Sequence, residues 1–417
     1  MKLDIIVYIF LLFLSFSITF LKFSSFLKIN TLYTLLWSLV GLLSKLDFLE
    51  IVKPSIQIHI FIWISIIVFN SIYLFLCVSS KAKEIPLLKY KVNYSYIYIL
   101  NLIAFLIIAP LFFQACIGIM QSGFSNYRGS IFELASGSDI SIFINRVVVG
   151  AIFDATAVIA AAEIIQGRKK LLKWAIAGIV LYTITYGGRY SIMNFIAYYV
   201  AAYLLLQKYK TFRIRLKKRY LILGMITLIM VTIGRGTGET GVLGMVVLYF
   251  VGSLSYLQVI LDHPVQYGLL DYTHGGMTFA FIVEPVALLL KFLFHLNIDT
   301  PSYHFNIYMQ PFSNIGAYSN VVMYNNNSTF LYNFLRDFGV IGIAIGTAFI
   351  SGLCAILENS SKKGNNRSIL LLIFMFGVII SSTMKYSLLT SKATIIILII
   401  LWVTRKQKNI TNSKEEV

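Results

Sequence analysis

Four arginines are the residues of this chain best suited to bind an anion. Arg189 and Arg235 each follow a glycine, Arg336 lies just before an apolar stretch, and Arg128 lies in a short polar segment. Glycine lets the backbone approach a ligand, and a guanidinium donates two parallel hydrogen bonds to phosphate oxygens. We therefore expect the four to bind a phosphate or pyrophosphate group, although each taken alone is also suited to anchoring a helix at lipid headgroups.

Three side chains are candidates for a base that takes a proton from a hydroxyl group: His304, Asp337 and Glu239. An imidazole titrates near neutral pH and suits this task, and a carboxylate can replace it. Because a histidine in a loop more often serves as a hydrogen-bonding residue, the sequence leaves the choice among the three open.

Polar and aromatic residues offer a place for a sugar. Asn327 ends a run of three asparagines, whose amides hydrogen-bond hydroxyl groups, while Tyr332 and Tyr190 have rings that cover apolar sugar faces. A polar turn is the alternative for the asparagine run. Arg146 and Asp154 lie about 12 Å apart along one predicted helix, so they favour a polar cavity wall over a direct pair.

The amino-acid composition indicates the kind of fold that holds these residues in place. Of the 417 residues 58% are hydrophobic and 12% are charged, and the mean hydropathy of +0.80 excludes a water-soluble domain. At about 20 residues per crossing, residues 1–417 are expected to form one all-α bundle of about 11–13 transmembrane helices. The apolar stretches, of which 29–43 and 275–294 are open as crossings, are 5–21, 29–43, 56–79, 94–120, 138–165, 171–186, 190–206, 219–233, 242–261, 275–294, 338–357, 368–384 and 388–403.

The net charge of +18 does not indicate nucleic-acid binding, because the basic residues are clustered in the connections between apolar stretches. Such connections lie in the cytoplasm by the positive-inside rule, which assigns the remaining connections to the outside. The polar tail, residues 404–417, is then cytoplasmic. The basic clusters are 81–91, 168–173, 208–219, 362–367 and 405–408.

Residues 262–337 form the one long polar connection. The segment holds four of the five histidines and four of the seven prolines, and Lys291 and Arg336 are its only basic residues. Its low basic charge places it outside, and its many aromatic residues argue against disorder. We expect a loop region of short helices, folded over the outer mouth of the bundle.

The chain lacks the common nucleotide-binding and metal-binding patterns. It has no Gly-x-x-x-x-Gly-Lys-Ser/Thr loop, no His-Glu-x-x-His and no Asp-x-Asp pair. Cys77, Cys116 and Cys354 lie in apolar stretches without the spacing of a metal site or a disulfide framework, so they are predicted to be core residues. The sequence therefore predicts no cofactor and no metal, and an activated lipid as the source of energy.

Three local motifs lie at the outer ends of the expected spans. They are Tyr186-Gly187-Gly188-Arg189, Gly275-Gly276-Met277-Thr278-Phe279, and Asn327-Ser328-Thr329-Phe330-Leu331-Tyr332 followed by Asp337-Phe338-Gly339. In these motifs, and in the topology of the whole chain, the sequence resembles the Wzy-type oligosaccharide repeat unit polymerases, relatives of the O-antigen polymerases and ligases.

The resemblance implies a GT-C-like glycosyltransferase of the bacterial inner membrane. The growing glycan on undecaprenyl pyrophosphate is then the donor and a lipid-linked repeat unit the acceptor, with Arg189, Arg235 and Arg336 holding the pyrophosphate. The product is a surface polysaccharide such as O-antigen, and a flippase and a chain-length regulator are implied partners besides membrane lipids. The alternatives are a ligase that moves finished glycan to another acceptor and, from another class, a transporter of lipid-linked sugar.

Overall fold

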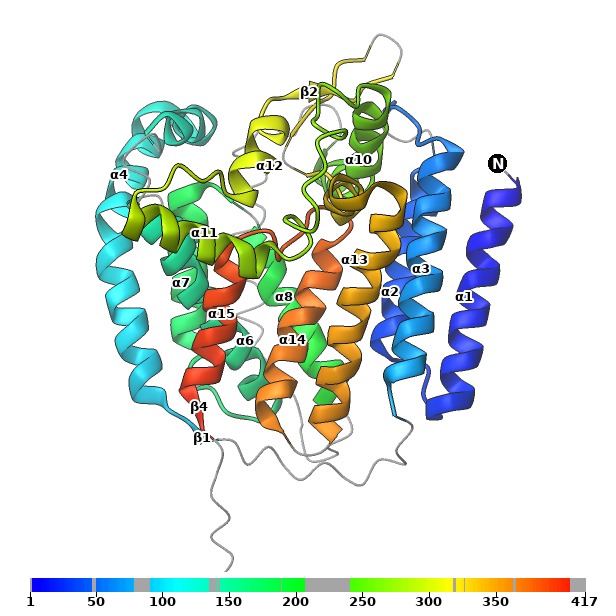
Figure 1. Ribbon diagram of the computed structural model, residues 1–417. Helices are drawn as coiled ribbons and strands as arrows, with labels where there is room; N and C mark the ends of the chain where they lie inside the picture. The colour runs from blue at the N-terminus through cyan, green and yellow to red at the C-terminus, as the bar shows by residue number, and fades with distance from the viewer. Residues whose placement is uncertain are drawn as a thin grey trace, which may run out of the picture.

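The computed structural model is a bundle of helices (Figure 1). It describes residues 2–46, 50–78, 91–134, 141, 143–188, 190–206, 241–317, 320–325, 327–362 and 365–405. The long helices are α1 (Lys2–Phe23), α2 (Ile29–Leu43), α3 (Ile56–Leu76), α4 (Tyr94–Leu134), α6 (Val149–Ile165), α7 (Leu172–Tyr186), α8 (Tyr190–Leu206), α10 (Gly241–Asp262), α11 (Ala280–Phe294), α13 (Phe330–Lys362), α14 (Asn366–Ser381) and α15 (Ser391–Val403). A π-helical turn η1 (Phe143–Val148) leads into α6, and α12 (Pro301–Met309) is a short helix.

Among the described residues, five helical segments are both long and apolar enough to cross a membrane. They are Asp4–Phe23, Ile56–Leu76, Tyr94–Gly123, Phe143–Ile165 and Phe330–Lys362, and six shorter apolar helices accompany them. Their number and composition are those of a multi-pass helical membrane protein, as the hydropathy predicts. The expected span 219–233 lies outside the described residues.

The two stretches that were open as crossings differ in the structure. Helix α2 packs alongside α1 and α3, in the direction of the bundle (Figure 1). Helix α11 instead lies across the bundle, over one end of α15. We call the end of the bundle that carries α11 and α12 the α12 end, and the opposite end the β4 end.

In the described part of the chain, one small sheet lies at each end of the bundle. At the β4 end, β1 (Lys91–Val92) pairs antiparallel with β4 (Thr404–Arg405). At the α12 end, β2 (Ser313–Asn314) pairs antiparallel with β3 (Met323–Tyr324). A bridge between Ile51 and Gly316 ties this second sheet to the α2–α3 connection.

Helices α14 and α15 are too short to cross a bilayer. They have 16 and 13 residues, which at 1.5 Å per residue gives about 24 and 20 Å against roughly 30 Å of hydrocarbon. Their connection, residues 382–390, therefore lies within the bundle. Other parts of the protein supply hydrogen bonds to its backbone. Phe330 N–H donates to the Ser382 carbonyl (2.9 Å), and the Ser253 hydroxyl donates to the Thr383 carbonyl (2.5 Å).

Helix α13 consists of two segments joined by a sharp bend. Phe338 (φ −144°, ψ 24°) and Gly339 (φ 61°, ψ −146°) are non-helical, and the second conformation is essentially limited to glycine. A Cβ on Gly342 would lie 1.9 Å from the carbonyl oxygen of Phe334, so this glycine lets the first segment pack against the second. The bend thereby fixes the position of residues 330–337.

Candidate functional site

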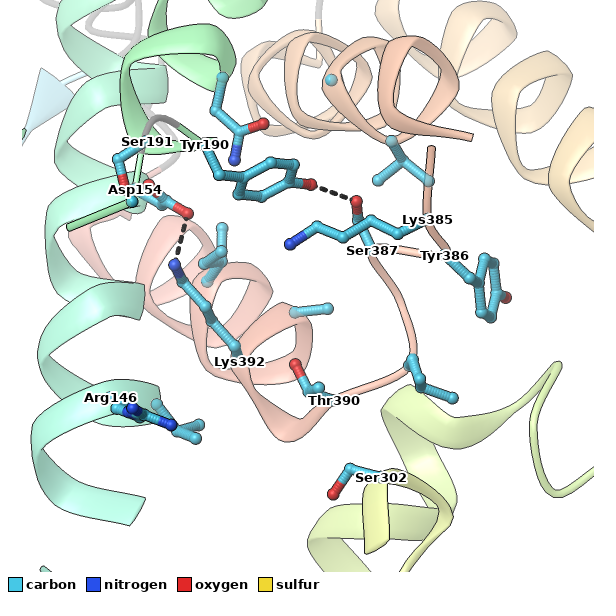
Figure 2. A pocket seen from close by; sticks show the side chains of 18 of the residues that line it. Arg146, Asp154, Tyr190, Ser191, Ser302, Lys385, Tyr386, Ser387, Thr390 and Lys392 are labelled. Carbon is cyan, nitrogen blue, oxygen red and sulfur yellow. Dashed lines mark hydrogen bonds and ion pairs between the residues drawn. The ribbon is translucent and has the colours of Figure 1, made fainter. Parts of the chain in front are cut away.

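A cavity at the α12 end of the bundle is lined by basic side chains. It has a volume of about 460 Å³ and lies among α6, α8, α12, α14 and α15 (Figure 2). Its charged lining residues are Arg146, Asp154, Lys385 and Lys392. We call it the cationic cavity.

The two lysines reach this cavity from the 382–390 connection and from the first turn of α15. Lys392 Nζ lies 2.8 Å from a carboxylate oxygen of Asp154 and 5.1 Å from the ring centre of Tyr182. Lys385 Nζ lies 3.4 Å from the ring centre of Tyr190. Among the described residues no carboxylate lies within 4.0 Å of Lys385. A positive charge held over an aromatic face in this way remains available to an anion.

The charge of the cationic cavity favours a doubly charged anion. Its described lining residues supply three cations and one carboxylate, which leaves an excess of two positive charges. In a space walled by protein, such charges attract an anion more strongly than they would in water. A phosphate or diphosphate group matches this excess.

Hydroxyl, amide and aromatic groups complete the wall of the cationic cavity. The hydroxyls of Tyr190 and Ser387 share a hydrogen bond, and Ser387 shares another with Ser381. Asn306 and Asn327 line the same space from α12 and from the segment before α13. This mixture of rings and hydrogen-bonding groups is suited to the apolar faces and the hydroxyl groups of a sugar.

The second cavity, which we call the His304 cavity, has a volume of about 450 Å³. His304, Arg336 and Tyr308 line it together with two carboxylates, Asp271 and Asp299. Tyr308 donates a hydrogen bond to Asp271 (3.0 Å), and this bond raises the pKa of the Tyr308 hydroxyl. Carboxylates accept hydrogen bonds from hydroxyl groups, so the His304 cavity suits a neutral sugar better than an anion.

Arg336 is buried in the wall of the His304 cavity, with 1% of its surface exposed. Its Nη1 donates to the carbonyl oxygen of His304 (3.3 Å) and to the Tyr332 hydroxyl (3.5 Å), and its guanidinium carbon lies 4.9 Å from the ring centre of Tyr308. Within the described part of the chain, its Nε has no acceptor and no carboxylate lies within 4.0 Å. A buried guanidinium in this state has donors left for a ligand.

Asp337 holds the segment in front of α11. Its Oδ1 accepts from the Thr273 hydroxyl (2.5 Å) and from Met277 N–H (3.0 Å), and its Oδ2 accepts from Thr278 N–H (2.5 Å). The side chain is fully buried. These bonds position one wall of the His304 cavity, which Thr273 and Met277 line.

Helix α12 separates the two cavities. Pro301, His304 and Tyr308, which share one stripe of the helix at spacings of three and four residues, line the His304 cavity. Ser302, Phe305 and Asn306 belong to the neighbouring stripe and line the cationic cavity. Because Pro301 and Ser302 are adjacent, the cavities come close to each other at the first turn of α12.

The structure divides the candidate residues between the two cavities. His304 and Arg336 meet in one, and Tyr190 and Asn327 line the other. Tyr332 is buried behind Arg336 and donates its hydroxyl to the Tyr267 carbonyl (2.8 Å). The described part of the chain leaves out Arg189, Arg235 and Glu239 and the side chain of Arg128.

The sequence-based prediction missed Lys385 and Lys392. Each is a single lysine that carries no motif, and Lys385 lies between two predicted spans whereas Lys392 lies within the predicted span 388–403. For Lys385 the available signal is its position in a connection assigned to the outside, where few basic residues are expected. For Lys392 it is a charged residue within an apolar span, which usually faces a cavity or a partner. Arg146 and Asp154 do line the cationic cavity, as their placement within an apolar stretch suggested.

Among the described residues, no three histidine, cysteine, aspartate or glutamate side chains gather as they would around a metal ion. Comparisons with protein-family models, with curated proteins and with solved structures find no match to this chain.

Proposed function

We propose that this protein polymerises lipid-linked oligosaccharide repeat units by glycosyl transfer at the α12 end of the bundle. In this proposal the α12 end faces away from the bacterial cytoplasm, and the protein belongs with the Wzy-type polymerases. The carrier lipid is undecaprenyl pyrophosphate, and the product is a surface polysaccharide. The observation that carries the proposal is the pair of cavities on adjacent stripes of α12, one cationic and one lined by His304, Arg336 and carboxylates.

The cationic cavity suits the donor. When the anomeric carbon leaves its phosphate oxygen, the bonding electron pair stays on the diphosphate, whose negative charge grows. Lys385, Lys392 and Arg146 are positioned before the reaction and stabilise this charge more in the transition state than in the ground state. The sugar attached to the diphosphate then lies against Tyr190 and the neighbouring amides.

The His304 cavity suits the acceptor. The hydroxyl oxygen of the acceptor sugar forms the new bond to the anomeric carbon, and its proton must leave. His304 faces the His304 cavity and is the base in this proposal. Asp271 and Asp299 accept hydrogen bonds from other acceptor hydroxyls, while Arg336 donates to a sugar oxygen or to the leaving diphosphate.

The distribution of charge supports the proposed orientation. Lys170 lies with its Nζ 4.8 Å from the ring centre of Tyr94, next to β1, and Arg367 donates to the carbonyl oxygen of Thr404 in β4 (2.6 Å from Nη2). These basic residues therefore lie at the β4 end, which by the positive-inside rule is cytoplasmic.

Replacement of the two cavity lysines tests the proposal. In the native host, or in membranes supplied with lipid-linked repeat units, Lys385→Met and Lys392→Met should each stop the product at a single repeat unit. Loss of one charge-assisted contact to the leaving group lowers the rate by about 100-fold or more. The measurement is the ladder of glycan lengths on a gel, read beside the amount of protein in the membrane.

Two matched variants separate chemistry from folding. Lys45, which pairs with Asp4 at 2.9 Å and lines neither cavity, is the control lysine, and the double variant D4N/K45M, which leaves no uncompensated carboxylate, should give a normal ladder. The double variant D154N/K392M removes both members of the buried pair and leaves no uncompensated carboxylate, so it should fold but not polymerise. Normal ladders in Lys385→Met and in D154N/K392M would contradict the proposal.

A further inference from the structure

Helix α11 has two faces with different surroundings. Ala280, Glu284 and Ala287 are buried against the bundle at spacings of four and three residues. On the opposite face a stripe of large apolar side chains is exposed: Ile282, Val286, Leu289 and Leu293. We call it the α11 stripe. An exposed apolar stripe of this regularity is a contact surface for an apolar partner.

The buried face fixes α11 across the end of α15. Pro285 has no N–H group, so the carbonyl oxygen of Phe281 lacks its usual helical partner, and the Thr394 hydroxyl of α15 donates to this oxygen instead. The Phe281 ring lies 5.9 Å from that of Phe349 in α13, at an angle of 26°. Helix α11 is therefore firmly attached to the bundle through its inner side.

The depth at which α11 lies in the bilayer follows from the length of α15. Starting from the charged β4 end, the 13 residues of α15 cover about 20 Å of the roughly 30 Å of hydrocarbon. About 10 Å remain, which is close to the 10–12 Å diameter of one helix with its side chains. A helix that lies over the end of α15 (Figure 1) thus fills the last layer of the bilayer, at the boundary with the headgroups.

We propose that α11 is an interfacial helix whose stripe of Ile282, Val286, Leu289 and Leu293 inserts among the acyl chains of the lipid leaflet at the α12 end. The occupant of the stripe is bulk phospholipid. This inference does not depend on the proposed glycosyl transfer. It rests on the exposed stripe, on the attachment to α15 and on the length of that helix.

The proposal makes α11 a link between the lipid surface and the two cavities. On its inner face, a carboxylate oxygen of Glu284 accepts from the Ser302 hydroxyl (2.6 Å) and the other accepts from Ser302 N–H (3.2 Å). Ser302 lies in the first turn of α12 and lines the cationic cavity, and Val283 of α11 lines the His304 cavity. Insertion of the stripe therefore holds the helix that separates the cavities at a fixed depth.

Spin labels on single cysteines test the insertion. In a chain carrying Cys77→Ala, Cys116→Ala and Cys354→Ala, Leu289→Cys and Leu293→Cys are labelled, and the protein is placed in vesicles of phosphatidylethanolamine and phosphatidylglycerol. Dissolved oxygen should speed the spin relaxation of the labels at both positions, and a water-soluble nickel chelate should not. Leu106→Cys, exposed on the apolar part of α4, is the lipid reference, and Val321→Cys, exposed between β2 and β3, is the water reference.

Chelate access at positions 289 and 293 equal to that at 321 would overturn the inference. If the chain without its three cysteines does not insert, the same positions are tested as Leu289→Trp and Leu293→Trp in the native background. Lipids brominated on their acyl chains should then quench the added fluorescence, and aqueous iodide should not. Quenching by iodide alone would equally overturn it.

Discussion

At the scale of single residues, Arg336 and Asp337 are neighbours in the chain that differ in how fully their hydrogen-bonding groups are paired. Both carboxylate oxygens of Asp337 are occupied by three hydrogen bonds from one short segment. Arg336 is equally buried, yet its Nε has no acceptor among the described residues. A buried side chain whose hydrogen bonds are all made within the protein is suited to positioning its neighbours. A buried donor without an acceptor is suited to binding a ligand. We therefore assign Arg336 to substrate binding and Asp337 to the support of its wall.

Asp337→Asn distinguishes support from catalysis. The amide has one acceptor oxygen in place of two, so a buried N–H of Met277 or Thr278 loses its partner, at a cost of about 1–3 kcal/mol. We expect a lower midpoint of thermal unfolding in detergent. His304→Gln, in contrast, should leave the midpoint unchanged and remove glycosyl transfer. If Asp337→Asn abolished transfer without any change in the midpoint, Asp337 would be the base and the assignment to support would fail.

The sequence predicts the kinds of residue at this site better than their grouping. His304 and Arg336 were singled out separately, and the structure brings them into one cavity because α12 and the first segment of α13 lie side by side there. The pair of Asp154 and Lys392 joins α6 to α15, which are far apart in the chain. No local spacing reports such a pair, so only the folded chain reveals it.

At the scale of elements, the bend in α13 determines where Arg336 lies. The motif residues Asp337-Phe338-Gly339 predict the start of a span, whereas the helix already begins at Phe330 and bends at Gly339. Hydropathy does not show this, because the first segment contains polar and charged residues and is nevertheless fully buried. The glycine at 339 and the close contact at Gly342 are what make the bend possible.

Gly342→Ala should both destabilise the protein and reduce polymerisation. The added methyl group would lie 1.9 Å from the carbonyl oxygen of Phe334, so the segment that carries Arg336 must move. Overpacking of this kind costs about 1–3 kcal/mol. Gly352→Ala in the same helix is the matched control, since its Cβ would meet only Leu76 Cδ1 at 3.7 Å. Thermal unfolding and the glycan ladder are measured for both, and equal results for the two variants would refute this account of the bend.

The α14–α15 hairpin shows why element boundaries cannot be read from apolar runs alone. The sequence predicts spans at 368–384 and 388–403, but the helices end at Ser381 and resume at Ser391. The residues between are held by hydrogen bonds from α10 and from the start of α13. Since those partners come from elsewhere in the chain, nothing within 382–390 indicates that the connection lies inside the bundle.

At the scale of the whole molecule, the two ends of the bundle have different chemistry. Among the described residues, the β4 end carries Lys170 near β1 and Arg367 bound to β4. The α12 end carries both cavities and, across them, the helix with the α11 stripe. The all-helical class and most helix positions were predictable from composition and hydropathy, because a membrane allows few other backbone structures. The lateral position of α11 was not, since hydropathy does not distinguish a helix that crosses from one that lies flat.

This asymmetry predicts which end faces out. In the cysteine-free chain, Val321→Cys at the α12 end should react with a membrane-impermeant maleimide added to spheroplasts, whose inner membrane is intact. Val78→Cys, exposed at the β4 end of α3, should react only after the membrane is permeabilised. The reason is that basic connections stay in the cytoplasm, and Val78 lies just before the basic cluster 81–91. The reverse pattern of labelling would place both cavities in the cytoplasm, where they could not meet a glycan that has already been moved across the membrane.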